Sequence, residues 1–264
     1  MSGALEVTDL RVTFQRRGND PVLAVNGVSL TVPAGGAVGL VGESGSGKTT
    51  VARVIAGIQV PDHGEVRLDG ELLRPRRTKA QHRAVQLVFQ DPYSSLNPRR
   101  TIGSVLRELL AIHELAQGAA AAKRCAELME LVGLPAAALE RKPNAFSGGQ
   151  RQRLAIARAL AVQPSVIVAD EPVSALDVSI QATILELFAR LRAELGVSLL
   201  LISHNLAVVR QLCEEVAVMY MGEIVEFGER DQIFSAPQHP YTRTLLDAVP
   251  RLNAAAASTE EETR

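Results

Sequence analysis

This sequence of 264 residues has few cysteines, no long apolar run and almost no net charge. No run approaches the roughly 18–20 apolar residues that a membrane-spanning helix needs, and residues 1–11 lack the basic start and apolar core of a secretion signal. We therefore expect a soluble, cytosolic protein. The formal net charge of −1 gives no reason to expect nucleic acid as the main partner.

Cysteine and lysine are both scarce in this sequence. Cys125 and Cys213 are far apart and lack the spacing of metal ligands, so we predict ordinary reduced thiols. Only four lysines occur, at positions 48, 79, 123 and 142, which makes Lys48 conspicuous in a chain that otherwise uses arginine. Apolar residues make up 47% of the chain, enough for the core of one large domain or two small ones.

The sequence is organised around GESGSGKT at positions 42–49, a glycine, four free positions and then Gly-Lys-Thr. The apolar run 37–41 predicts a buried strand before it, and residues 50–56 predict a helix that Gly57 ends. Glycines let backbone N–H groups turn onto phosphate oxygens, Lys48 would reach the β- and γ-phosphates, and the Thr49 hydroxyl would bind Mg²⁺. The alternative is a flexible Gly/Ser loop that binds nothing, which the strand and helix on either side disfavour. The predicted binding residues are Gly42, Glu43, Ser44, Gly45, Ser46, Gly47, Lys48, Thr49 and Thr50.

Strands and helices alternate along the rest of the chain, which predicts an α/β sheet. Strands are expected at 5–14, 65–68, 84–89, 165–169, 197–202, 216–220 and 223–227, and a pair of strands at 22–32 broken near Asn26-Gly27. Asp69-Gly70 predicts a tight hairpin turn, and residues 74–83 a charged surface segment. Helices are expected at 180–195 and 205–213.

Residues 91–146 differ in texture from the rest. Residues 91–98 predict a loop, and 101–115 and 119–132 follow a helical period with no strand character, so we expect a helical subdomain set into the α/β core. At the other end, residues 253–264 are alanine-rich and then acidic, which predicts a disordered tail.

Polar residues follow several predicted strands where those strands end. Asp170 would complete a Mg²⁺ site opposite the loop threonine, and Glu171 would orient and deprotonate an attacking water. His204, after the next strand, would bond the γ-phosphate and hold that water, and Gln90 would touch Mg²⁺ or the water. A surface acidic pair is the alternative for positions 170–171, and the phosphate loop upstream disfavours it.

Two further elements bear on nucleotide binding. Phe14 is the candidate for stacking on an adenine ring, and a core phenylalanine is an equally good interpretation. Ser147, Gly148 and Gly149 open a helix, with Gln150 placed as in a capping box, and such a start binds anions well. Because this element lies in the helical region, away from the first site, two chains arranged head to tail would let each cap the other's ATP. The alternative is a plain helix cap.

An ordered set of motifs resembles the nucleotide-binding subunits of ABC transporters over residues 5–250. The motifs are FSGGQRQR at 146–153, VIVADEP at 166–172, SALD at 174–177 and His204, with the glycine loop ahead of them. Phe146 stands where leucine is commonest in the family. The resemblance implies a P-loop NTPase core sheet (5–90 and 160–235), an inserted helical subdomain (91–159), an antiparallel β subdomain and an extension at 236–250, with 251–264 as the tail.

The family's functional roles are carried onto the matching residues as implications of that resemblance. Lys48, Thr49 and Asp170 would bind phosphate and Mg²⁺, Glu171 would be the base and His204 the switch. Gln90 would sit in the lid that senses the permease. Ser147 to Gln150 would bind the partner's ATP, and Asp177 would carry crosstalk between the two sites.

Two stretches are similar to the oligopeptide/dipeptide/nickel importers of that family: FQDPYSSLNPRRTIG at 89–103 and HPYTRTLLDAVP at 239–250. The first implies that Asp91 to Arg100 contacts the membrane subunit. Many relatives carry a cysteine cluster after the second stretch, thought to bind an iron–sulfur centre. Because no cysteine follows Cys213 here, we predict no iron–sulfur cluster.

The resemblance implies an ATPase that energises uptake of peptides or a related solute such as nickel, peripheral to the cytoplasmic face of the membrane. Two integral-membrane permeases and a second ATPase (a heterodimer, with a homodimer as the alternative) would be its partners. An extracellular solute-binding protein would act indirectly. The competing hypothesis is a soluble ABC ATPase of translation or DNA repair, but no second ATPase unit, long coiled coil or zinc module is visible. Export is a third option, although this chain lacks the fused membrane spans of many exporters. The cargo stays open among peptides of different length, nickel and glutathione.

Overall fold

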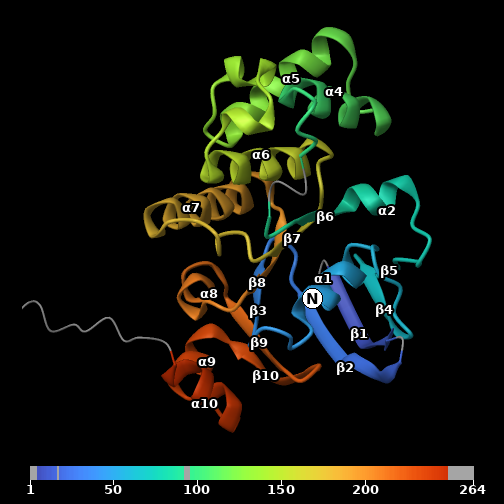
Figure 1. The fold of residues 1–264 in the computed structure, drawn as a ribbon, viewed down its shortest axis with the longest axis vertical. Coiled ribbons are helices and arrows are strands. Elements are labelled where there is room, and N and C mark those ends of the chain that lie inside the picture. Colours follow the sequence, from blue (N-terminus) through green and yellow to red (C-terminus); the bar gives the residue numbers. More distant parts are fainter. Residues whose placement is uncertain (1–4, 17, 92–95, 249–264) are drawn as a thin grey trace, which may run out of the picture.

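The computed structural model describes residues 5–16, 18–91 and 96–248, which form two sheets flanked by helices (Figure 1). One sheet is antiparallel, in the order β2-β1-β4-β5. Its strands are β1 (Leu5–Arg16), β2 (Asn19–Val32), β4 (His63–Leu68) and β5 (Glu71–Leu72). As expected, Asp69 and Gly70, both at positive φ, turn the chain between β4 and β5.

The other sheet is parallel except for its last strand, in the order β10-β9-β3-β8-β7-β6. Only β10 runs antiparallel, against β9. The strands are β3 (Ala37–Val41), β6 (Val85–Val88), β7 (Val166–Asp170), β8 (Ser198–Ser203), β9 (Glu215–Tyr220) and β10 (Glu223–Glu229). The α/β class and the antiparallel second sheet predicted from the sequence are confirmed.

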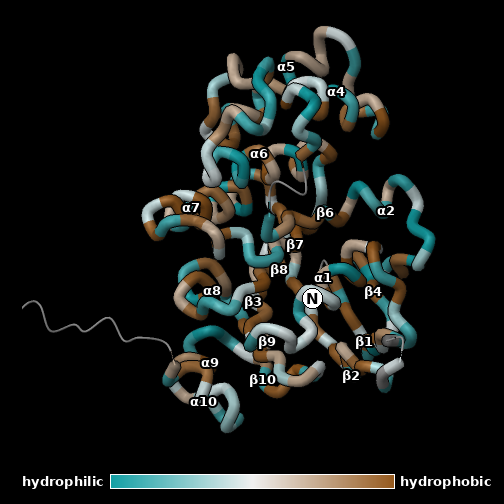
Figure 2. The backbone as a smooth tube through the Cα atoms, viewed as in Figure 1, coloured by the Kyte–Doolittle hydropathy of each residue, from teal (hydrophilic) through white to brown (hydrophobic). Residues whose placement is uncertain are grey.

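Both faces of the parallel sheet are buried, which explains why its strands are continuous apolar runs. On β7, Val166 and Val168 face a core shared with the antiparallel sheet, while Ile167 and Ala169 face a core shared with helices. Figure 2 shows hydrophobic residues gathered along the central strands. A strand with this pattern is stable only inside a layered domain, so its position in the middle follows from its composition.

Helices cover the sheet in two groups. The core between the two sheets includes α1 (Lys48–Ile55). Helix α2 (Lys79–Ala84) lies at the surface and has no buried residue. The core on the other face of the parallel sheet is formed with the remaining helices. They are α4 (Ile102–Ile112), α5 (Gly118–Leu131), α6 (Gly148–Ala161), α7 (Val178–Leu195), α8 (Leu206–Leu212), α9 (Arg230–Ser235) and α10 (Pro240–Asp247), with short 3₁₀ turns at Ala136–Glu140 and Pro143–Ala145. Among them, α6 lies between the sheet and the pair α4 and α5 (Figure 1).

One local prediction needs correction, and the surface segment 74–83 holds a helix start that was not predicted. Residues 22–32 were expected to form two strands, but β2 is one strand in which Gly27, at φ 73°, makes a bulge between the Leu10–Val28 and Arg11–Asn26 pairs. The segment 74–83 includes the start of α2, whose signal is a capping box between Thr78 and Gln81. The predicted tail and part of the 91–98 loop lie outside the described residues.

Across residues 5–16, 18–91 and 96–248, no helix combines the length and apolar character that crossing a bilayer requires.

The close packing of α8 on β3 makes a stability prediction. A Cβ at Gly39 would lie 2.3 Å from Val209 Cγ1, so Gly39→Ala overpacks this core and should lower the free energy of unfolding by roughly 1–3 kcal/mol in urea titrations. The matched control is Gly228→Ala on β10, where the nearest atom would be at an ordinary 3.5 Å. Equal stability of both variants would contradict this packing.

Candidate functional site

The glycine loop joins β3 to the N-terminus of α1, as its pattern predicts. Gly42 and Gly47 have φ angles of 152° and 109°, in the region that favours glycine. A Cβ at Gly42 would lie 2.1 Å from the Met219 carbonyl oxygen, and one at Gly47 would lie 2.3 Å from the Ala24 carbonyl oxygen. These two positions therefore require glycine both for conformation and for space, and they fix the loop against β9 and β2.

Lys48 is the cation at the centre of the loop. Its side chain is buried, and the ammonium Nζ donates to the carbonyl oxygens of Gly42 and Glu43, each at 2.7 Å, and to Ser46 Oγ at 3.3 Å. The loop thus wraps the ammonium and orients it by three oxygens. A point charge at a helix N-terminus with backbone N–H groups around it is suited to phosphate oxygens.

The charges of the site shift one another's ionisation. Burial lowers the pKa of Lys48, and the carboxylates of Glu171, Asp170 and Glu43 oppose that shift. Burial raises the pKa of Asp170, and the hydrogen bond from Thr49 and the charge of Lys48 oppose that shift. Each buried charge is therefore stabilised by an opposite charge nearby, and a bound anion or cation would change this balance.

Thr49 and Asp170 form the predicted metal-binding pair. Thr49 Oγ1 donates to Asp170 Oδ1 at 3.3 Å, which joins the start of α1 to the end of β7. A hydroxyl and a buried carboxylate are oxygen ligands of the kind Mg²⁺ takes, so this donor set fits the ion. Gln90, the third predicted ligand, lies two residues after β6, and its Nε2 donates to Ser174 Oγ at 3.3 Å.

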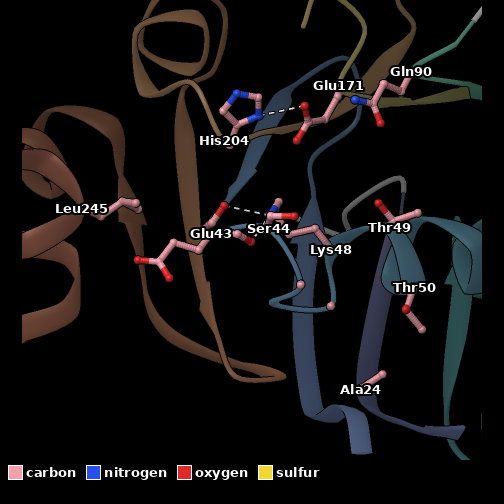
Figure 3. Close-up of a pocket in the computed structure, with 13 residues that line it drawn as sticks. Ala24, Glu43, Ser44, Lys48, Thr49, Thr50, Gln90, Glu171, His204 and Leu245 are labelled. Atoms are coloured by element: carbon pink, nitrogen blue, oxygen red, sulfur yellow. Dashed lines mark hydrogen bonds and ion pairs between the residues drawn. The ribbon is translucent and has the colours of Figure 1, made fainter. Parts of the chain in front are cut away.

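Glu171 and His204 are joined directly, a contact that the sequence did not predict. His204 Nδ1 lies 2.8 Å from Glu171 Oε2 (Figure 3). Glu171 has a positive φ of 48°, and its N–H donates to the Ile202 carbonyl oxygen at 2.9 Å. A non-glycine residue in this strained conformation marks a position where side-chain direction matters. The imidazole holds the carboxylate at the cavity wall.

One cavity of about 630 Å³ brings most of the predicted residues together. Figure 3 shows Glu171, His204 and Gln90 on one side and the loop on the other. Ser46 and Asp170 lie behind this lining, bonded to Lys48 and Thr49 respectively. The predicted residues that line the cavity are Gly42, Glu43, Ser44, Gly45, Gly47, Lys48, Thr49, Thr50, Gln90, Glu171 and His204.

Three predicted elements lie elsewhere. Phe14 is on β1 with 38% of its surface exposed and is not among the residues that line the cavity. Ser147 to Gln150 begin α6, where Ser147 Oγ accepts from the Gln150 N–H at 3.3 Å and the Gln150 side chain accepts from the Ser147 N–H at 3.0 Å. Asp177 is the exposed first residue before α7. The capping box is confirmed, and within the described chain this element and Asp177 stay apart from the cavity.

Sequence reasoning missed Ala24 and Leu245, which complete the lining. Ala24 lies on β2, and its carbonyl faces Gly47, a contact that only the packing of β2 reveals. Leu245 lies on α10, within the HPYTRTLLDAVP stretch. The helical spacing between Tyr241 and Leu245 was the available signal, since residues four apart share a helix face.

Comparisons with known proteins agree with these motifs. A family model described as ABC transporter matches residues 25–174, and one described as oligopeptide/dipeptide transporter, C-terminal region, matches residues 225–263. The oligopeptide transport ATP-binding protein OppF of Lactococcus lactis is 46% identical, over 96% of this chain and 82% of that protein. The dipeptide transport ATP-binding protein DppF of Escherichia coli is 47% identical, over 88% of this chain and 70% of that protein. A solved dimeric ATP-binding cassette, bound to ADP and Pi in a post-hydrolysis state, is 30% identical with a TM-score of 0.74, over 86% of this chain and 98% of its own.

The position of Lys48 makes the first prediction about the site. Lys48→Ala removes the buried ammonium, and we expect ATP affinity to fall about tenfold or more because a charge-assisted bond to phosphate is lost. Equilibrium titration of the purified chain with a fluorescent ATP analogue measures this. Lys123→Ala is the matched control, because Lys123 is exposed on α5. ATP affinity unchanged in Lys48→Ala would contradict the role of the loop.

Proposed function

Because the chain belongs to the ABC transporter family, as an ATP-binding subunit and therefore an ATPase, we propose that it hydrolyses ATP to drive the import of peptides. The observation that carries the proposal is the single cavity in which the Glu171–His204 pair faces Lys48 and its loop. Such an arrangement provides a triphosphate cradle on one wall and a carboxylate for a water molecule on another. Positioning and electrostatics do most of the work in phosphoryl transfer.

Each group of the cavity has a distinct task in ATP hydrolysis to ADP and phosphate. The loop N–H groups and Lys48 would bind the β- and γ-phosphates, and Glu171 would take the proton of the attacking water. His204 would orient Glu171 through their 2.8 Å contact and reach the γ-phosphate. Thr49 and Asp170, with Gln90, would hold Mg²⁺, which when bound neutralises charge on the transferred group. Phe14 remains our candidate for the adenine contact.

A second chain is part of the proposal. Ser147 to Gln150 form a helix start that is suited to an anion yet remote from the chain's own cavity. Two chains arranged head to tail would place this start against the partner's ATP, with Asp177 carrying crosstalk between the sites. The dimeric state of the solved relative supports this arrangement. We propose a heterodimer with a second ATPase, a homodimer being the alternative.

The membrane partners are inferred from the peptide-importer relatives and the matching C-terminal region. We propose that two permease subunits hold the ATPases at the cytoplasmic face of the membrane and that Asp91 to Arg100 contacts them. An extracellular solute-binding protein would deliver the cargo. The proposed boundaries are 5–90 and 160–235 for the core, 91–159 for the helical insertion and 236–250 for the extension. We expect no iron–sulfur cluster and no nucleic-acid partner.

The role of Glu171 predicts a separation of binding from turnover. Glu171→Gln keeps the size of the side chain but removes the base, so ATP binding should persist while turnover falls by roughly 100-fold or more. Phosphate release by the purified protein or complex measures this. Glu186→Gln, at an exposed position on α7, is the matched control. Near-normal turnover in Glu171→Gln would refute the assignment of Glu171 as the general base.

The partner proposal predicts what travels with the protein. Purification of the tagged chain from its native membranes in mild detergent should bring down two permease proteins and a second ATPase, identified by mass spectrometry. The identity of those partners would indicate the cargo. Recovery of the chain with ribosomes or nucleic acid, and without permeases, would refute the transport function and leave only the ATPase chemistry.

A further inference from the structure

The last helix of the described chain reaches back to the phosphate loop. The Tyr241 hydroxyl, on α10, accepts a hydrogen bond from the Glu43 backbone N–H at 2.9 Å, although the two residues are 198 positions apart. One helical turn on, Leu245 lines the same cavity as Glu43 (Figure 3). A segment outside the phosphate-binding motifs therefore touches the loop itself.

The residues around Tyr241 fix α10 in this place. The Glu226 carboxylate, on β10, accepts from the backbone N–H groups of Gln238 at 2.8 Å and His239 at 3.0 Å. His239 Nδ1 then accepts from the Tyr241 N–H at 3.2 Å as the helix cap, and Pro240 follows it in the first turn. The start of the helix is thus anchored to the edge of the main sheet.

The ring of Tyr241 is held as well as its backbone. It packs against the Tyr220 ring at the end of β9, with centroids 4.1 Å apart and planes tilted by 32°. Burial raises the pKa of Tyr241, and the phenol oxygen accepts the loop N–H at 2.9 Å. The hydroxyl therefore meets Glu43 from a fixed direction.

Glu43 links this contact to the central cation. Tyr241 accepts from the N–H of Glu43, while the carbonyl oxygen of the same residue accepts from Lys48 Nζ at 2.7 Å. Removing the phenol oxygen would release one of these two restraints on a glycine-rich loop with high conformational freedom. Ordering the loop on a phosphate would then cost more entropy, and affinity would fall.

We propose that Tyr241 is a positioning residue of the nucleotide site, fixing the Glu43 backbone so that the phosphate loop is ordered to receive ATP. The C-terminal extension is then part of the ATP site and not only an appendage to the core. This inference rests on the proposed ATPase function. It assigns Tyr241 no contact with ATP and no step in the chemistry.

Tyr241→Phe tests this, because it deletes only the hydroxyl and keeps the ring against Tyr220. We expect the dissociation constant and the KM for ATP to rise about fivefold, the effect of losing one neutral hydrogen bond of about 1 kcal/mol. The kcat of Tyr241→Phe should stay within about twofold of the wild-type value, since Glu171 and His204 are untouched. In the control Tyr220→Phe, the affinity for ATP should also stay within about twofold of the wild-type value. Within the described chain the Tyr220 hydroxyl has no hydrogen-bond partner, so the control removes the same atom from the neighbouring ring.

The outcomes separate a positioning role from a structural one. A lower thermal midpoint with ATP affinity unchanged would overturn the proposal, as would equal losses of affinity in Tyr241→Phe and Tyr220→Phe. Wild-type affinity in Tyr241→Phe would likewise overturn it while leaving the ATPase function intact. Wild-type protein that bound no ATP would instead overturn the proposed function, and this inference with it.

Discussion

Parallel pairing of four neighbouring strands is the constraint on which the site depends. Val41 pairs with Ser203, Ile202 with Asp170, and Ala169 with Val88, so β3, β8, β7 and β6 end level with one another. The next residue or two on each strand are then delivered to one edge of the sheet: the loop after β3, His204, Glu171 and Gln90. Hydrogen bonding between the strands fixes this register. Because side chains alternate along a strand, a slip of one residue would turn each side chain to the opposite face of the sheet.

The site built at that edge concentrates opposite charges in a partly buried place. Burial lowers the pKa of Lys48 and nearby carboxylates oppose that shift, while burial raises the pKa of Asp170 and the hydrogen bond from Thr49 opposes it. Unpaired buried charges would cost several kcal/mol. The positive φ of Glu171 adds a local strain of about 1–3 kcal/mol, which the parallel sheet sustains. The surrounding cores supply the stability that such a site uses.

The last helix of the described chain, α10, joins this system through a contact with the loop backbone. Each residue of the HPYT sequence has a structural role in this helix. His239 is the N-cap, Pro240 is the first helical residue, the Tyr241 hydroxyl contacts the loop, and Thr242 is buried. His239 also donates its backbone N–H to Glu226 on β10, so the start of the helix is fixed by both local and tertiary contacts. The extension is thereby connected to Glu43, the residue that also receives Lys48.

Local patterns were enough to predict the glycine loop, the strands around it, the capping box at Ser147 and the polar residues at strand ends, because each depends on neighbours in sequence. Patterns shared with a family supplied the proposed roles of Asp177 and of the residues that a partner chain would use. Tertiary structure alone decided the contact of His204 with Glu171, the lining by Ala24 and Leu245, and the bond from Glu43 to Tyr241. It also decided that Asn26-Gly27 is a bulge, since two strands must pair before an extra residue can be seen. These depend on strand order and on packing between residues up to 198 positions apart, and no local period encodes either.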